Sequence, residues 1–201
     1  AVILRSGKDG LRSAEAIVVC LQSALKLSGL PEACIQIVPS ESRDAATKML
    51  EGLNGSIDVI VPRGGKSLVA EVEKSAKVPV FGHLEGICHI YVDEEADEEK
   101  ALSICLNAKM RRTGICGAVE TILVHENISS SFVPKLVASL SEVNCEIRCC
   151  KKTIDFDNRA KLASEDDWST EYLAAIVSLK SVASVDEAIS HVEKYGTGHT
   201  E

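Results

Sequence analysis

The sequence predicts an α/β fold built on mostly parallel sheets. Short apolar runs rich in β-branched residues alternate with amphipathic stretches of about ten or more residues, which is typical of successive βα units. The 201 residues, of which 45% are hydrophobic and 26% charged, suffice for a sizeable core in one large domain or parts of two. We therefore expect a compact globular protein that needs no disulfide to fold.

The first part of the chain is predicted to form three and a half βα units. Residues 1–5 are expected to form a strand, followed by a helix that Ser13 caps and that Gly29 and Pro31 end. The elements expected next are strands at 34–38, 57–61 and 79–82 and helices at 43–50 and 66–75. The segment FGHLEG then predicts a crossing between two lobes near residue 84.

The second part repeats the pattern with longer elements. Strands are expected at residues 87–92, 119–125, 145–149 and 171–179, and helices at 97–111, 132–141 and 185–194, the last ended by Gly196. Residues 151–169 are polar and weakly periodic, and we expect them to form a surface excursion of the second lobe.

Composition excludes several classes of protein. A net charge of −8 with only 3% aromatic residues argues against a nucleic-acid-binding surface. A mean hydropathy of +0.08, without an apolar run near about 18 residues, argues against a membrane span. The eight cysteines show no C-x-x-C spacing and the histidines no H-x-x-x-H spacing, so we expect reduced thiols in the cytoplasm and no metal site.

Two basic, glycine-containing loops are candidates for binding a nucleotide. The first, RSGKDGLR at residues 5–12, follows the first strand and carries Arg5 and Lys8. The second, VPRGGKS at 61–67, follows another predicted strand and carries Arg63, Gly64 and Gly65. Such loops offer backbone N–H groups and positive charge to a phosphate. An ordinary basic turn remains the alternative, because the first lacks G-x-G-x-x-G and the second lacks the leading glycine of a P-loop.

Cys116 is the candidate nucleophile. It follows a predicted helix, lies between Gly114 and Gly117, and comes shortly after Arg111 and Arg112. Glycines permit close approach of a substrate, and nearby guanidinium groups favour a thiolate. The alternative is that Cys116 is a small buried apolar residue, as lone cysteines often are.

Two histidines lie in glycine-containing turns and are worth testing. His83 belongs to the predicted crossing, and His199 belongs to YGTGHTE near the last residue. For each of them, as for the other histidines, a structural or solvent-facing position remains the alternative to a functional one.

Four motifs together resemble a known family. VPRGGKSLV at 61–69, FGHLEGICHIYVD at 81–93, NAKMRRTGICGAVETILVH at 107–125 and YGTGHTE at 195–201 are similar, in the same order, to segments of the γ-glutamyl phosphate reductases. This family, also called glutamate-5-semialdehyde dehydrogenases, is a branch of the aldehyde dehydrogenase superfamily. The resemblance implies an aldehyde-dehydrogenase-like fold with a Rossmann-like NADP-binding lobe at 1–84 and an α/β catalytic lobe at 85–201. Both lobes would be incomplete, and the absence of an initiator Met fits a central fragment.

The resemblance also implies an activity. Cys116 would attack the acyl carbon of L-glutamyl 5-phosphate, release phosphate and form a thioester, which NADPH reduces to L-glutamate 5-semialdehyde for proline biosynthesis. Hydrolytic members of the superfamily carry a Glu that activates water, and lining up the motifs places Gly82 at that position. The missing carboxylate would protect the thioester from hydrolysis. Glu85 lies near that position, and a role for it in proton transfer stays open.

Cofactor and partners are implied in the same way. Members that prefer NAD tend to carry a carboxylate where this chain has Lys8, preceded by Arg5, so the resemblance favours NADP. Arg63, Gly64 and Gly65 match the loop that lies over the nucleotide. The family relation further implies a homo-oligomer of the full-length protein and functional coupling to a glutamate 5-kinase, fused or separate.

Two alternatives from different classes remain. One is a CoA-acylating aldehyde dehydrogenase, against which the HLEGICH and GTGHT motifs argue. The other is a non-catalytic nucleotide-binding α/β module in which Cys116 is structural; thiol reactivity separates it from an enzyme.

Overall fold

A computed structural model describes residues 1–40 and 42–199 of the chain. The chain divides into two compact units, Ala1–Gly82 and His83–Glu201. Each unit is described by itself below. No helix within these described ranges is both long and apolar enough to cross a bilayer.

The first unit consists of helices around short parallel strands. Strand β1 (Val2–Leu4) pairs in parallel with β2 (Ile35–Ile37). The helices of this unit are α1 (Leu11–Leu27), α2 (Arg43–Leu50) and α3 (Lys66–Ser75). Helix α1 begins at Leu11 with Gly10 as its N-cap, which is earlier than the predicted cap at Ser13.

The expected strands at 57–61 and 79–82 are reduced to a single parallel bridge between Ile60 and Val80. The Ile60 N–H donates to the Pro79 carbonyl at 2.9 Å, and the Phe81 N–H donates to the Ile60 carbonyl at 2.8 Å. Pro62 and Pro79 have no N–H with which to extend this ladder. The prediction of two strands here is therefore wrong, because proline limits the pairing to one bridge.

The second unit is built on a five-stranded sheet in which every pairing is parallel. The strands lie in the order β3-β4-β7-β5-β6. Their bounds are Cys88–Val92 for β3, Val119–His125 for β4, Ile176–Val182 for β7, Glu146–Cys149 for β5 and Lys161–Leu162 for β6. Strand β4 is buried at every position, which explains its nearly continuous apolar sequence.

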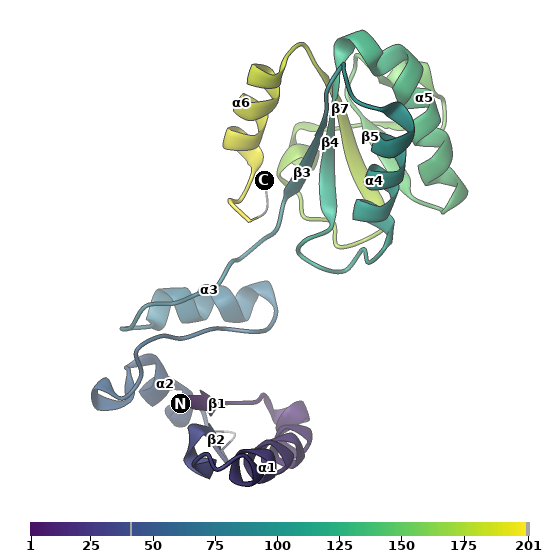
Figure 1. Cartoon of the computed structure of the whole chain (residues 1–201). Coiled ribbons are helices and arrows are strands. Elements are labelled where there is room, and N and C mark those ends of the chain that lie inside the picture. The colour runs from purple at the N-terminus through teal and green to yellow at the C-terminus, as the bar shows by residue number, and fades with distance from the viewer. Residues whose placement is uncertain (41, 200–201) are drawn as a thin grey trace. The chain divides into compact units, whose positions relative to one another are not determined.

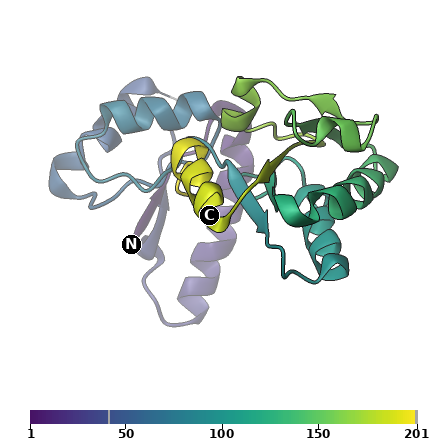
Figure 2. The ribbon, with the colours of Figure 1, turned by 90° about the horizontal axis from the view of Figure 1, so that it is seen from above.

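Helices cover both faces of this sheet (Figure 1). Helices α4 (Glu98–Met110) and α5 (Glu126–Glu142) pack on one face, and α6 (Val185–Tyr195) packs on the other. Figure 2 shows the same separation from above, with the yellow α6 across the strands from the teal and green helices. The larger apolar core lies on the α4 and α5 side, and a smaller one lies under α6.

Three elements of this unit differ from the prediction. Helix α5 begins at Glu126 rather than at 132, because the His125 side chain caps it by accepting from the Asn127 N–H at 3.3 Å. Strand β7 begins at Ile176, whereas residues 171–175 were expected to belong to it. The short β6 lies in the segment expected to be a surface excursion.

Candidate active site

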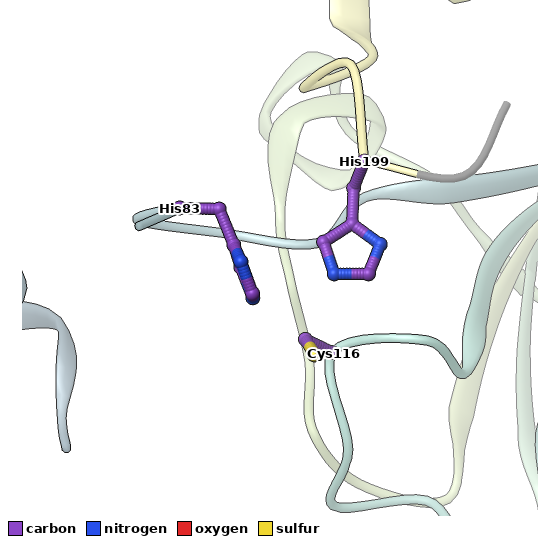
Figure 3. Close-up of side chains that lie close together, drawn as sticks. All are labelled: His83, Cys116 and His199. Atoms are coloured by element: carbon purple, nitrogen blue, oxygen red, sulfur yellow. The ribbon is translucent and has the colours of Figure 1, made fainter. Parts of the chain in front are cut away.

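Three side chains from distant parts of the sequence converge at the amino end of the second unit's sheet (Figure 3). His83 precedes β3, Cys116 lies in the loop between α4 and β4, and His199 follows α6. The starts of neighbouring parallel strands lie along one edge, and a helix that follows a strand returns the chain to that edge. The topology therefore brings the three residues together.

The three residues form a small, partly open cluster. One potential ligand atom from each, the Cys116 sulfur and a ring nitrogen of each histidine, lies within 4.8 Å of the others. The two imidazole rings meet edge to face, with their centroids 4.4 Å apart and their planes at 82°. His83 is exposed, while Cys116 and His199 are half-buried. Cys116 is thus only half-buried, and its sulfur has two groups nearby that can exchange protons.

Gly86, which precedes β3, lies in close backbone contact with Cys116. A Cβ atom at residue 86 would lie 2.0 Å from the Cys116 carbonyl oxygen, so no other residue fits without a backbone shift. The Gly86 N–H donates to Oε1 of Glu171 at 2.9 Å, and the Ile87 N–H donates to the Thr197 hydroxyl at 3.1 Å. These contacts join the three segments that carry the cluster.

Cys88 supports the cluster from the start of β3. Its buried thiol donates to the Cys116 carbonyl at 3.2 Å, and its sulfur lies 3.8 Å from Nδ1 of His199. The sequence analysis did not predict this contact of Cys88. Its position in a strand gave no signal of a second role, because the contact depends on two loops far away in the sequence.

A buried ion pair holds the loop of Cys116 between α4 and β4. Lys109 on α4 and Glu120 on β4 are both fully buried, with Nζ and Oε2 2.5 Å apart. Glu120 also accepts from the Leu173 N–H at 3.3 Å. Burial raises the pKa of the Glu120 carboxyl, and Lys109 opposes this shift. The pair fixes both ends of the loop.

The buried thiols of this unit differ from Cys116 in their surroundings. Burial raises the pKa of Cys105 to about 12 and that of both Cys145 and Cys149 to about 11. These three thiols pack in the larger core. None of the eight cysteines, all of which lie within the described residues, forms a disulfide.

The residues predicted to bind a nucleotide lie in the first unit. Arg5 and Lys8 are exposed before α1, and Arg63, Gly64 and Gly65 are exposed immediately before α3. Arg5 directly follows β1, Lys8 begins a short 3-10 helix just before α1, and the second set directly precedes α3.

Other predicted residues lie close to Cys116 in sequence. Arg111 and Arg112 are exposed between α4 and Cys116. Glu85 is half-buried next to Gly86. Thr200 and Glu201, the end of the YGTGHTE motif, lie outside the described residues.

Comparison with known proteins identifies the family. The sequence profile of the aldehyde dehydrogenase family matches residues 1–153. The chain belongs to this family. The structure of a γ-glutamyl phosphate reductase from Thermotoga maritima superimposes with a TM-score of 0.90 at 42% identity, over 99% of this chain and 48% of that one. An acetylating aldehyde dehydrogenase from Geobacillus thermoglucosidasius shares the fold, with a TM-score of 0.69 at 19% identity over 98% of this chain and 51% of that one. The predicted aldehyde-dehydrogenase-like α/β fold is confirmed.

Curated relatives are similar along the whole chain. A γ-glutamyl phosphate reductase from Parvibaculum lavamentivorans is 53% identical over 100% of this chain and 47% of its own length. Another protein of that name, from Bradyrhizobium diazoefficiens, is 55% identical over 100% of this chain and 46% of its own length. The resemblance drawn from the four motifs is confirmed. The chain spans about half the length of these relatives.

Proposed function

We propose that the full-length protein reduces L-glutamyl 5-phosphate to L-glutamate 5-semialdehyde and releases phosphate, as a step of proline biosynthesis in the cytoplasm. The observation that carries this proposal is a half-buried Cys116 whose sulfur lies beside two imidazoles. This cluster lies in a chain 53% identical throughout to a relative named for that activity.

Cys116 is the nucleophile in this reaction. Its thiolate forms a C–S bond to the acyl carbon, and the C–O bond to phosphate breaks with its electron pair, which leaves a thioester on Cys116. His83 and His199 are near enough to exchange the thiol proton, directly or through a water molecule. Cys88 and Gly86 hold the Cys116 backbone in place while the thioester forms and while it is reduced. A hydride, which the cofactor would supply, adds to the thioester carbonyl carbon and gives a thiohemiacetal. Its collapse breaks the C–S bond, releases the aldehyde and restores the thiolate.

NADP(H) is the proposed cofactor, and it supplies the hydride when bound. Helices α1 and α3 have Gly10 and Gly65 as their N-cap residues and receive no side-chain cap from any described residue, whereas the Ser42 hydroxyl caps α2. A Cβ at Gly65 would meet open space. Uncapped helix N-termini next to cationic side chains are suited to phosphate groups.

We assign a part of the cofactor to each of the predicted residues. Arg5 and Lys8 would bind the 2′-phosphate of the adenosine ribose, while Arg63, Gly64 and Gly65 would lie along the nucleotide.

The partners are proposed on the same basis. A small-molecule substrate suits an aldehyde dehydrogenase family member, and the full-length protein is proposed to be a homo-oligomer. A glutamate 5-kinase would supply the substrate, because an acyl phosphate must be made by phosphoryl transfer to a carboxylate.

The test is the reverse reaction of the full-length protein. We expect NADP-dependent oxidation of L-glutamate 5-semialdehyde that requires phosphate and is lost in Cys116→Ser, since serine is a far weaker nucleophile. Cys20→Ser, an exposed thiol on α1, is the matched control and should retain turnover. Turnover that requires CoA instead of phosphate would favour the acylating alternative. Turnover retained by Cys116→Ser would contradict the assigned nucleophile.

A further inference from the structure

We propose that His83, Cys116 and His199 form a binding site for one zinc ion, and that zinc reversibly blocks the nucleophile. The metal site itself rests on geometry and ligand chemistry. Only the blocking effect rests on the proposed function of Cys116.

The geometry of the cluster is close to that of three zinc ligands. Its ligand atoms lie within 4.8 Å of one another. In a tetrahedral zinc site, bond lengths of about 2.0–2.3 Å place the ligand atoms about 3.3–3.8 Å apart. Side-chain rotation of the exposed His83 can supply the remaining approach. Among the residues the structure describes, no other group of three histidine, cysteine or acidic side chains meets this distance criterion.

The chemistry of the donors selects the ion. One thiolate and two imidazoles favour zinc over magnesium or calcium, which prefer oxygen ligands. Three protein ligands leave a fourth position for water, as in open zinc sites. The Cys88 sulfur lies 3.8 Å from Nδ1 of His199. Cys88 would therefore help to orient the His199 ring as a ligand.

Zinc binding and catalysis compete for the same sulfur. When the ion binds, the Cys116 thiol releases a proton and the sulfur donates an electron pair to zinc. That electron pair is the one required to attack an acyl carbon. No oxidation or reduction is involved, so removing the ion restores the thiol.

The first experiment measures binding without reference to activity. The chelator-treated full-length protein is titrated with Co²⁺, a spectroscopic substitute for zinc. We expect one equivalent to produce thiolate-to-cobalt charge-transfer absorption, which zinc abolishes by displacement. The signal should disappear in Cys116→Ser, weaken in His83→Ala and His199→Ala, and persist in the control Cys20→Ser. Absence of the signal, or its persistence in Cys116→Ser, would overturn the proposal.

A second measurement uses the wild-type protein and avoids any question of misfolded variants. Zinc should protect Cys116 from alkylation, as followed by mass spectrometry, while Cys20 continues to react, and a chelator should reverse the protection. Equal protection or equal reaction of the two thiols would count against the site.

The activity measurement separates the two proposals. Buffered zinc should inhibit semialdehyde oxidation, and the inhibition constant should rise about tenfold or more in His199→Ala, because a ligand is lost. A cobalt signal in a protein without turnover would support the metal site and contradict the proposed function. Turnover unaffected by saturating zinc would overturn the proposed block.

Discussion

The position of Cys116 depends on a backbone contact that leaves no space for a side chain at residue 86. The Cys116 carbonyl oxygen would lie 2.0 Å from a Cβ there, and its carbonyl carbon 2.8 Å. Both atoms belong to the backbone, so they cannot rotate away as the end of a side chain can. The backbone of Cys116 is therefore held by close contact with the main chain at Gly86 and by a hydrogen bond from the Cys88 thiol to its carbonyl.

Substitution of Gly86 tests this contact. We expect Gly86→Ala to displace the Cys116 loop, lower the Tm by several degrees and reduce turnover at least tenfold, since small displacements of a nucleophile are costly. Gly117→Ala is the matched stability control, because a Cβ at Gly117 meets nothing within 4 Å. Calorimetry and the semialdehyde assay measure the two effects. An unchanged Tm in Gly86→Ala would show that the Cys116 loop moves without loss of stability, which would contradict the prediction.

At the scale of elements, the buried Lys109–Glu120 pair joins α4 to β4. Removal of one partner leaves a buried charge without compensation, which typically costs about 3–5 kcal/mol. We expect Lys109→Met to lower the stability of the unit by that order. Lys109→Met combined with Glu120→Gln should recover most of the loss, because Gln keeps an acceptor for the Leu173 N–H. Thermal unfolding of the three proteins measures this, and a double variant no more stable than the single one would contradict it.

The contact between β7 and α6 predicts a dependence of stability on pH. His191 on α6 is only 3% exposed and lies against Trp168 and Tyr195. Burial, assisted chiefly by Lys180, lowers its pKa from 6.5 to about 3. Its Nδ1 lies 3.2 Å from Nζ of Lys180, and His89, Lys194 and Glu165 also affect it. The folded protein thus keeps this ring neutral where the unfolded chain protonates it.

This difference in protonation determines how the stability changes with pH. Between the ordinary pKa and the lowered one, the unfolded state binds more protons, so unfolding becomes easier as the pH falls. We expect His191 to contribute a loss of about 1 kcal/mol per pH unit between about pH 6 and pH 5. His191→Phe should flatten this part of the Tm profile. Asp167, whose pKa is lowered from 3.8 to about 2, would act only at lower pH. If Tm fell equally with pH in the wild-type protein and in His191→Phe, His191 would not be the source of this pH dependence.

Elements with strong local signals were predicted with the observed bounds. Helix α2 has a Ser42 cap, helix α3 begins directly after Gly65, and β4 is an unbroken buried run. The start of β7 was not predictable, because long-range contacts occupy the residues before it. Glu171 accepts from the Gly86 N–H, and Leu173 adopts a positive φ of 50° while its N–H donates to Glu120.

The candidate active site was predictable only in part, because it too depends on contacts between residues far apart in the sequence. Two glycines indicated Cys116 locally, and the turns of His83 and His199 were singled out. Their convergence with Cys116 depends on the strand order β3-β4-β7 and on the return of α6. No local pattern in the sequence specifies that order.

At the scale of the whole molecule, the two units differ in how much apolar surface they bury. Of the buried apolar side chains, Val18, Val69 and Val72 belong to the first unit, and the others belong to the second. Helix α1 leaves apolar residues exposed, with Val19 at 62% and Leu27 at 90% exposure. Burial of apolar area is the main favourable contribution to folding.

Separate expression of the two units tests this difference. We expect residues 83–201 to unfold cooperatively alone, because an apolar core lies on each face of their sheet. Residues 1–82 alone should show a broad transition and bind a hydrophobic dye, since their short strands bury little. Calorimetry and dye fluorescence at equal concentration provide the comparison. A sharp transition of residues 1–82, or none for 83–201, would show that apolar burial does not determine which unit is autonomous.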